Sequence, residues 1–145
     1  MRTSCAEVAR TLSADSITLS IPHAKPYHGV ARLVVGGLAA RLDLSYEHLE
    51  DLQLALASVL ENEGYTVGPE VNVELVVDEG SLDLWIGPLS GDALRADLER
   101  ESETEIALGR LLRTVVEKVE LEERADGQWL RLEKRVKSVK TENAR

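Results

Sequence analysis

Apolar and polar side chains alternate along residues 16–21, which predicts a half-buried strand that Pro22 ends. Beyond it, apolar residues recur at helical spacing and predict a helix over residues 27–41. Pro26 suits the first turn of this helix, where a missing N–H is not needed. The residues expected to face the core from this helix are Val30, Leu33, Val34, Leu38 and Leu42.

A second helix is expected to follow Ser45, a good N-cap, and to run to about residue 63, where Gly64 stops it. Residues three and four positions apart share a helix face, so a stripe of polar and small residues is expected beside the apolar stripe. The apolar stripe consists of Leu49, Leu52, Leu56, Val59 and Leu60, and the polar stripe of Asp51, Ala55, Ser58 and Asn62.

The second half of the chain is expected to form two hairpins separated by helices. Trp85 and Trp129 fall in expected strands, where core packing is the preferred interpretation and a role at an interface stays open. The expected elements are, in order, strands 71–77 and 82–86 around a turn at 78–81, a turn-forming loop at 87–91, a short polar helix at 92–100, a third main helix at 103–117, and strands 119–123 and 128–136 around a turn at 125–127.

This order of elements predicts the fold class. Paired hairpins with few helices favour a mixed, mainly antiparallel sheet with helices on one face, hence a two-layer α+β sandwich. A chain of 145 residues is typical of a single domain. We expect that domain to span residues 1–136, followed by a polar tail at 137–145.

Composition narrows the classes of partner. The net charge of −9 argues against nucleic acid or an anionic membrane as the main partner, because both attract cationic surfaces. No apolar run approaches the about 20 residues of a membrane span, and no long apolar stretch follows Arg2 as in a secretory signal. The single Cys5 excludes an internal disulfide, so a cytoplasmic protein is expected. The three scattered histidines, which are not expected to bind metal, are His23, His28 and His48.

Two stretches carry a resemblance to a known family. The element order resembles that of the histidine-kinase-like ATPase fold, also called the Bergerat or GHKL fold. Two segments carry the same resemblance, the helix entry Asp43-Leu44-Ser45 and the helix segment Glu50-Asp51-Leu52-Gln53-Leu54-Ala55-Leu56. Within this fold the chain is most similar to bacterial anti-sigma regulatory factors of the serine-kinase type, over about residues 17–135. The closing segment, from Arg110-Leu111-Leu112-Arg113 through Val119-Glu120 to Trp129-Leu130-Arg131-Leu132, is similar in pattern.

The resemblance implies an activity and a set of partners. Members of the family bind ATP, sequester a sigma factor and phosphorylate a serine on an antagonist protein. An Asn on the second helix holds the magnesium ion, and a carboxylate four residues earlier acts as general base. An Asp-x-Gly-x-Gly motif reads the adenine, and a glycine-rich turn before the third helix brings backbone N–H groups to the phosphates.

This chain departs from the family pattern at three places. Asn62 matches the metal-holding Asn, but Ser58 stands where the general base belongs, and a serine hydroxyl is not a base near neutral pH. Gly87-Pro88-Leu89-Ser90-Gly91 replaces the adenine motif, with Asp92 five positions late. Ile106 and Leu108 fall where phosphate-binding glycines belong, with Gly109 out of step. The candidates for a vestigial nucleotide site are therefore Asn62, Gly87, Gly91, Asp92 and Gly109.

We expect a non-catalytic regulatory protein resembling an anti-sigma factor. It would bind a sigma factor or an anti-sigma antagonist, with homodimerisation consistent with the resemblance, and no cofactor unless Mg-ATP still binds. One alternative is an active, Mg-ATP-dependent serine kinase with Asp51 or Glu61 as substitute base, although neither shares the right helix position. The other is a small-molecule sensor whose cleft is lined by Ile106 and Leu108.

Overall fold

A five-stranded sheet forms one layer of the molecule. The computed structural model describes residues 15–42, 44–78, 80–100 and 107–135. The strand order is β1-β2-β3-β5-β4, and each pair of neighbours is antiparallel. The strands are β1 (Asp15–Pro22), β2 (Glu70–Asp78), β3 (Ser81–Leu89), β4 (Lys118–Arg124) and β5 (Gly127–Arg135).

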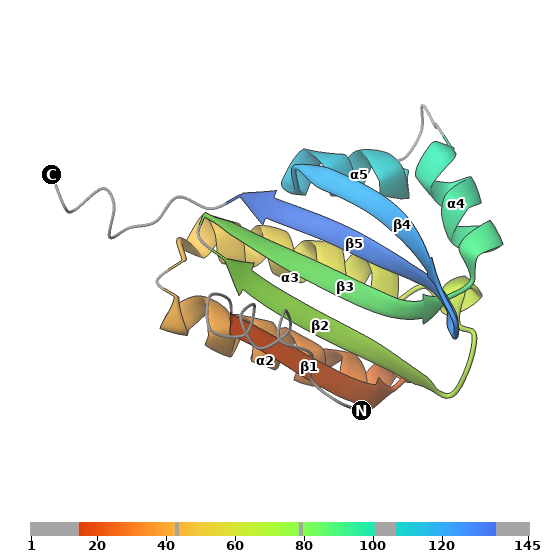
Figure 1. Ribbon diagram of the computed structural model, residues 1–145, viewed down its shortest axis with the longest axis horizontal. Helices are drawn as coiled ribbons and strands as arrows, with labels where there is room; N and C mark the ends of the chain where they lie inside the picture. Colours follow the sequence, from red (N-terminus) through yellow and green to blue (C-terminus); the bar gives the residue numbers. More distant parts are fainter. Residues whose placement is uncertain (1–14, 43, 79, 101–106, 136–145) are drawn as a thin grey trace, which may run out of the picture.

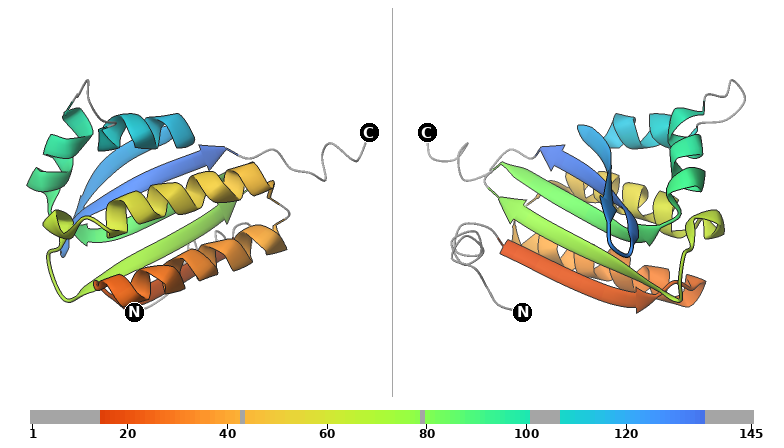
Figure 2. Two further views of the ribbon diagram at one scale, coloured as in Figure 1. Left: turned by 180° about the vertical axis from the view of Figure 1, so that it is seen from behind. Right: turned by 45° about the vertical axis from the view of Figure 1, so that its right-hand side comes forward.

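The described helices form the second layer, on one face of the sheet, and none of them lies on the other face (Figures 1 and 2). The predicted two-layer α+β sandwich is therefore confirmed. None of the helices within the described ranges has the length and apolar character needed to span a membrane. The helical elements are η1 (Lys25–Tyr27), α2 (His28–Arg41), α3 (Tyr46–Leu60), η2 (Glu63–Tyr65), α4 (Gly91–Glu99) and α5 (Leu108–Val115).

Helix α3 crosses the centre of the sheet on its helix-bearing face and carries much of the core (Figure 2, left). The Ser45 hydroxyl caps it by accepting a hydrogen bond from the His48 N–H at 3.1 Å. The predicted apolar stripe is confirmed, with only Leu49 partly exposed. Residues that fill the space between α3 and the sheet include Leu52, Leu56, Val59, Leu75, Leu84, Ile86, Leu130 and Leu132.

The core-facing side of α2 differs from the prediction. Leu33 is 76% exposed and Val30 is 40% exposed, whereas both were expected in the core. Helix α2 carries apolar residues around most of its circumference, so the sequence pattern does not identify a single buried face. The face that packs inward includes two alanines and a valine, whose small side chains suit close packing. The buried residues of α2 are His28, Ala31, Val35, Leu38 and Ala39.

Three predicted boundaries are wrong. Helix α3 ends at Leu60, before the predicted residue 63, because Asn62 adopts an extended backbone (φ −92°, ψ 107°). Strand β3 continues to Leu89, through the stretch predicted as a loop, with an irregular register after Ile86. Helix α5 begins at Leu108, after an extended Ala107, and the part of the predicted helix at 103–106 lies outside the described residues, as does the predicted tail.

Candidate functional site

Ser58 and Asn62 do not form a pair on one helix face. The Ser58 hydroxyl donates a hydrogen bond to the Leu54 carbonyl of its own helix at 2.8 Å. Asn62 lies beyond the end of α3, where its side-chain oxygen accepts a hydrogen bond from the Gly64 N–H at 2.8 Å. A helix that continued through residue 63 would place the side chains of residues 58 and 62 one turn apart on a common face. Because α3 ends at Leu60, that arrangement of a base and a metal ligand is not present.

Tyr65 connects the end of α3 to α4, and the sequence prediction missed it. Its ring is 1% exposed, and its hydroxyl donates a hydrogen bond to Asp97 Oδ2 at 2.6 Å. Its carbonyl accepts from the Ser90 N–H at 2.9 Å, which holds η2 against the end of β3. Burial, reinforced by the hydrogen bond to Asp97, raises the pKa of Tyr65 well above its ordinary value of 10.0. The signal in the sequence was an aromatic residue close behind the expected helix in a chain with only three tyrosines and no phenylalanine.

Gly87, a candidate for nucleotide contact, lies beneath an indole ring. A Cβ at this position would overlap Trp129, at 2.6 Å from Cγ and 2.8 Å from Cε2. Gly87 and Trp85 face the same side of β3, which is the side opposite the buried Ile86. The missing side chain of Gly87 is therefore filled by protein on the outer face of the sheet, away from α3.

The two tryptophans form a small cluster on that outer face. The prediction that they pack in the core between the layers is therefore wrong. The Arg124 guanidinium lies 4.1 Å from the Trp129 ring centroid and 4.8 Å from that of Trp85. The indole N–H of Trp129 donates to Asp126 Oδ1 at 2.9 Å. Trp129 is 3% exposed, because Gly87 and Arg124 cover it.

The other two candidate glycines also lie against parts of the same chain. A Cβ on Gly91 would overlap the side chain of Gln128. A Cβ on Gly109 would overlap the carbonyl oxygen of Leu98, so this glycine lets the first turn of α5 approach the end of α4. Asp92 lies exposed in the first turn of α4, 4.0 Å from Arg95. Leu108 is the first residue of α5, whereas Ile106 lies outside the described residues.

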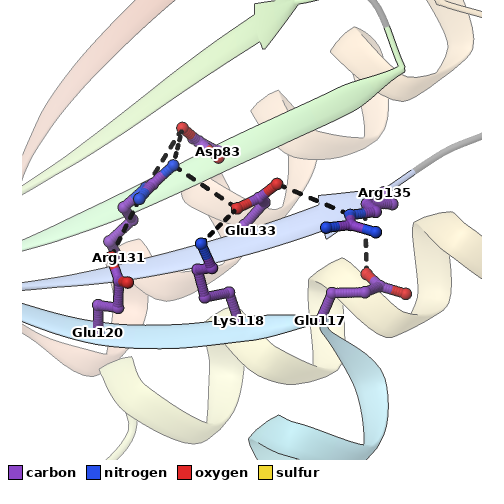
Figure 3. Close-up of polar contacts among 7 residues, drawn as sticks. All are labelled: Asp83, Glu117, Lys118, Glu120, Arg131, Glu133 and Arg135. Atoms are coloured by element: carbon purple, nitrogen blue, oxygen red, sulfur yellow. Dashed lines mark hydrogen bonds and ion pairs between the residues drawn. The ribbon is translucent and has the colours of Figure 1, made fainter.

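A network of charged side chains covers part of the outer face of the sheet (Figure 3). Arg131 bonds Asp83 Oδ2 and Glu120 Oε1, each at 3.0 Å, and lies 3.6 Å from Glu133. Lys118 also contacts Glu133, at 3.9 Å. Asp83 is the aspartate nearest before the position of the adenine motif, and Arg131 holds it on the sheet face opposite the described helices.

Neither alternative base stands one helical turn before Asn62 on a common helix face, as the family's general base would. Asp51 is near the start of α3 and accepts from Lys134 Nζ at 3.0 Å, while the same ammonium donates to the Val115 carbonyl at 2.7 Å. Glu61 is the exposed C-cap of α3. Among the described residues, no three His, Cys, Asp or Glu side chains are gathered as metal ligands. The five candidate nucleotide residues are thus spread over η2, the end of β3, α4 and α5.

Comparison with known proteins shows that the chain is similar to bacterial serine-protein kinases. No family model matches it. It is 32% identical over 134 residues to the serine-protein kinase RsbW of Halalkalibacterium halodurans, covering 79% of this chain and 80% of that protein. It is 33% identical over 91 residues to RsbW of Listeria monocytogenes (59% and 55% covered), and 29% identical over 99 residues to RsbW of Bacillus velezensis (61% and 58%). Together with the two-layer sandwich, this similarity shows that the chain belongs to the RsbW family of serine-protein kinases, the anti-sigma branch of the histidine-kinase-like ATPase fold.

Proposed function

We propose that this protein is a non-catalytic regulator of the anti-sigma type, which acts by binding another protein. The observation that carries the proposal is Ser58. It stands where the family has its general base, and its hydroxyl is donated to the Leu54 carbonyl. Without a base at this position, the hydroxyl of a substrate serine has no group to accept its proton.

The described residues do not fit Mg-ATP in the way the family implies. Asn62 has left the helix, and its side-chain oxygen already accepts the Gly64 N–H. Gly87 and Gly109 accommodate Trp129 and the Leu98 carbonyl, so their lack of a side chain is explained by packing within the chain. These contacts support a cleft that no longer binds ATP productively.

Calorimetric titration with Mg-ATP tests this part of the proposal, on the wild type and on Asn62→Ala. We expect no heat of binding in either protein at millimolar ATP. Serine-protein kinase RsbW of H. halodurans, measured in parallel, provides the comparison. Micromolar binding by the wild type that is lost in Asn62→Ala would overturn the proposal, because it would show a working magnesium ligand.

The proposed partner is a sigma factor or an anti-sigma antagonist, as the family resemblance implies. We expect the chain, immobilised and exposed to cytosol of its own organism, to retain one of these two classes of protein in the absence of ATP. Titration with the purified partner would then give its affinity with and without Mg-ATP. Retention that depends on added ATP would contradict a regulator that works by binding alone.

Helix α2 supports the further proposal that two copies associate. Tyr27, Val30 and Leu33 expose apolar surface along α2 and its entry, and Gly37 has open space above it. We expect sedimentation velocity to show a dimer for the wild type and a monomer for Leu33→Glu. Val67→Glu, at an exposed apolar residue outside the helices, is the control and should stay dimeric. A monomeric wild type at high concentration would contradict the dimer.

An active serine kinase is the second candidate, and the names of the relatives favour it together with the retained Asn62. Asp51 is an unsuitable base, because Lys134 holds it at the start of α3. Glu61 is the remaining carboxylate near Asn62. Transfer of labelled phosphate from ATP to a partner serine, abolished in Asn62→Ala and in Glu61→Gln, would establish this candidate over the non-catalytic regulator.

A further inference from the structure

His28 is buried without a hydrogen-bond partner. It is the first residue of α2, is 9% exposed, and has no partner at either ring nitrogen. His23 approaches it with ring centroids 6.1 Å apart and ring planes at 63°, and His23 Nδ1 also lacks a partner. These three ring nitrogens account for three of the four buried side-chain polar atoms that lack partners in the described part of the chain. Such a concentration calls for a physical explanation.

The pair lies where three elements meet. The ring nitrogen Nε2 of His23 is 3.4 Å from the carbonyl oxygen of Leu60, the last residue of α3. The backbone N–H of His23 donates a hydrogen bond to the carbonyl of Pro69, just before β2, at 2.8 Å. His28, whose ring contacts that of His23, is the first residue of α2. The two imidazoles therefore join the start of α2 to the end of α3, immediately before Glu61 and Asn62.

The surroundings favour a neutral His28. Burial lowers its pKa below 6.5, and the neighbouring His23 and Lys25 lower it further, while Glu61 acts in the opposite direction. The position at the N-terminal end of α2 also disfavours a cation, because the free N–H groups there carry partial positive charge. An imidazolium at His28 would have two N–H donors and no acceptor among the contacts that the structure describes.

We propose that His23 and His28 form an acid-sensitive latch, which holds the start of α2 against the end of α3 while His28 is neutral and releases it when His28 is protonated. Release changes two surfaces at once. It loosens the start of α2, which carries the exposed apolar residues Tyr27 and Val30, and it loosens the chain that leads from Leu60 into Asn62 and Tyr65. The proposal depends only on the contacts at this junction and is independent of whether the protein binds ATP.

The direction of the pH effect follows from linkage. His28 binds its proton more weakly in the folded protein than in the unfolded chain, whose pKa is 6.5. Its neutral form therefore supports folding fully above that value, and this support is lost progressively as the pH falls below it. Each unit by which the pKa is lowered corresponds to a tenfold preference for the unprotonated ring in the folded state.

The test combines a titration with a matched set of variants. NMR titration of the histidine Cε1–H signals, assigned with His23→Leu, His28→Leu and His48→Leu, should give His28 a pKa below 6.5. On acidification from about pH 7.5 to about pH 5, hydrogen-exchange protection should fall first in the first turn of α2 and in residues 61–65. His28→Leu should abolish this local loss, because an apolar side chain suits the site at every pH, and the control His48→Leu, in the first turn of α3, should keep it.

Two results would overturn the proposal. One is a His28 pKa at or above 6.5 in the wild type, which requires no variant to fold. The other is an acid-induced loss of protection at α2 that persists unchanged in His28→Leu, because the latch would then not be the group that titrates.

Discussion

Gly87, Gly91 and Gly109 each lie against another part of the same chain, and the neighbours are Trp129, Gln128 and the Leu98 carbonyl. The sequence indicated that Gly87 and Gly91 lie in a segment that replaces the adenine motif and that Gly109 is out of step, but it could not identify what these glycines contact. Trp129 is 42 positions from Gly87 in the sequence and is brought to it only by the pairing of β3 with β5. Contacts of this kind depend on sheet register, which a local pattern does not contain.

Replacing Gly87 with alanine tests the close packing of the indole. The added Cβ would overlap the Trp129 ring, so we expect the free energy of unfolding to fall by about 1–3 kcal/mol, as in other overpacked sites. Urea unfolding followed by tryptophan fluorescence measures this change. Gly68→Ala is the control, because nothing lies within 4 Å of its added Cβ. A Gly87→Ala protein as stable as Gly68→Ala would show that the ring moves away at little expense.

Tyr65→Phe tests the link between η2 and α4. Loss of the hydrogen bond to the Asp97 carboxylate should lower the free energy of unfolding by about 1–2 kcal/mol near pH 7. The raised pKa of Tyr65 means that the neutral phenol supports folding fully below 10.0, and that this support is lost as the pH rises beyond that value. Chemical unfolding at several alkaline pH values should therefore show a steeper decline for the wild type than for Tyr65→Phe. Parallel declines would contradict the assignment.

Helices and strands were predicted in the right order, because hydrophobic periodicity and capping are local properties. Ser45 begins α3 as expected, and the hairpin strands pair as expected. The face of α2 and the end of α3 were not predictable in the same way. Helix α2 has two apolar stripes, and its packing against neighbouring elements determines which one is buried. Helix α3 ends at Leu60, and the hydrogen bond from the Gly64 N–H to the Asn62 side chain forms beyond that end, so the helix stops before it reaches Gly64.

Lys134 of β5 joins this strand to α3 and to α5. Its ammonium is largely buried and bonds both Asp51 on α3 and the Val115 carbonyl at the end of α5. We expect Lys134→Ala to lower the free energy of unfolding by about 3 kcal/mol, because a partly buried carboxylate and a carbonyl lose their partner together. Thermal and urea unfolding measure the effect. Arg95→Ala removes an exposed pair at 4.0 Å and, as the control, should change stability by less than about 0.5 kcal/mol. Equal effects of the two substitutions would mean that the Lys134 contacts contribute no more than an exposed pair does.

For the whole molecule, the architecture could be predicted from the sequence, but the arrangement of the candidate site could not. Layer architecture follows from element order, so the α+β sandwich could be derived from the sequence. The site depends on how η2, α4 and α5 meet, and those contacts join residues such as Tyr65 and Asp97 that lie on separate elements. The position of Ser58 on α3 could be predicted from the sequence, because residue spacing within a helix is regular.

The net charge of −9 has a consequence for the whole fold. Excess negative charge repels itself most strongly in the compact state, and added salt screens this repulsion within about 10 Å at 0.1 M. We expect the midpoint of thermal unfolding, followed by circular dichroism, to rise as sodium chloride increases from about 0.02 M to about 0.2 M. A variant with Glu99→Lys and Glu123→Lys, both at exposed positions, should respond less. A midpoint that falls with salt would show that attractive pairs such as those of Arg131 dominate instead.

The indole over Gly87 also bears on the order in which this sequence can change. An aspartate at position 87, as the adenine motif of the family would require, needs the space that Trp129 occupies. The substitution becomes tolerable only after Trp129 has been replaced by a smaller residue, and that replacement removes the ring on which Arg124 rests. A lineage carrying this tryptophan would therefore have to pass through a less stable intermediate to place an aspartate at position 87.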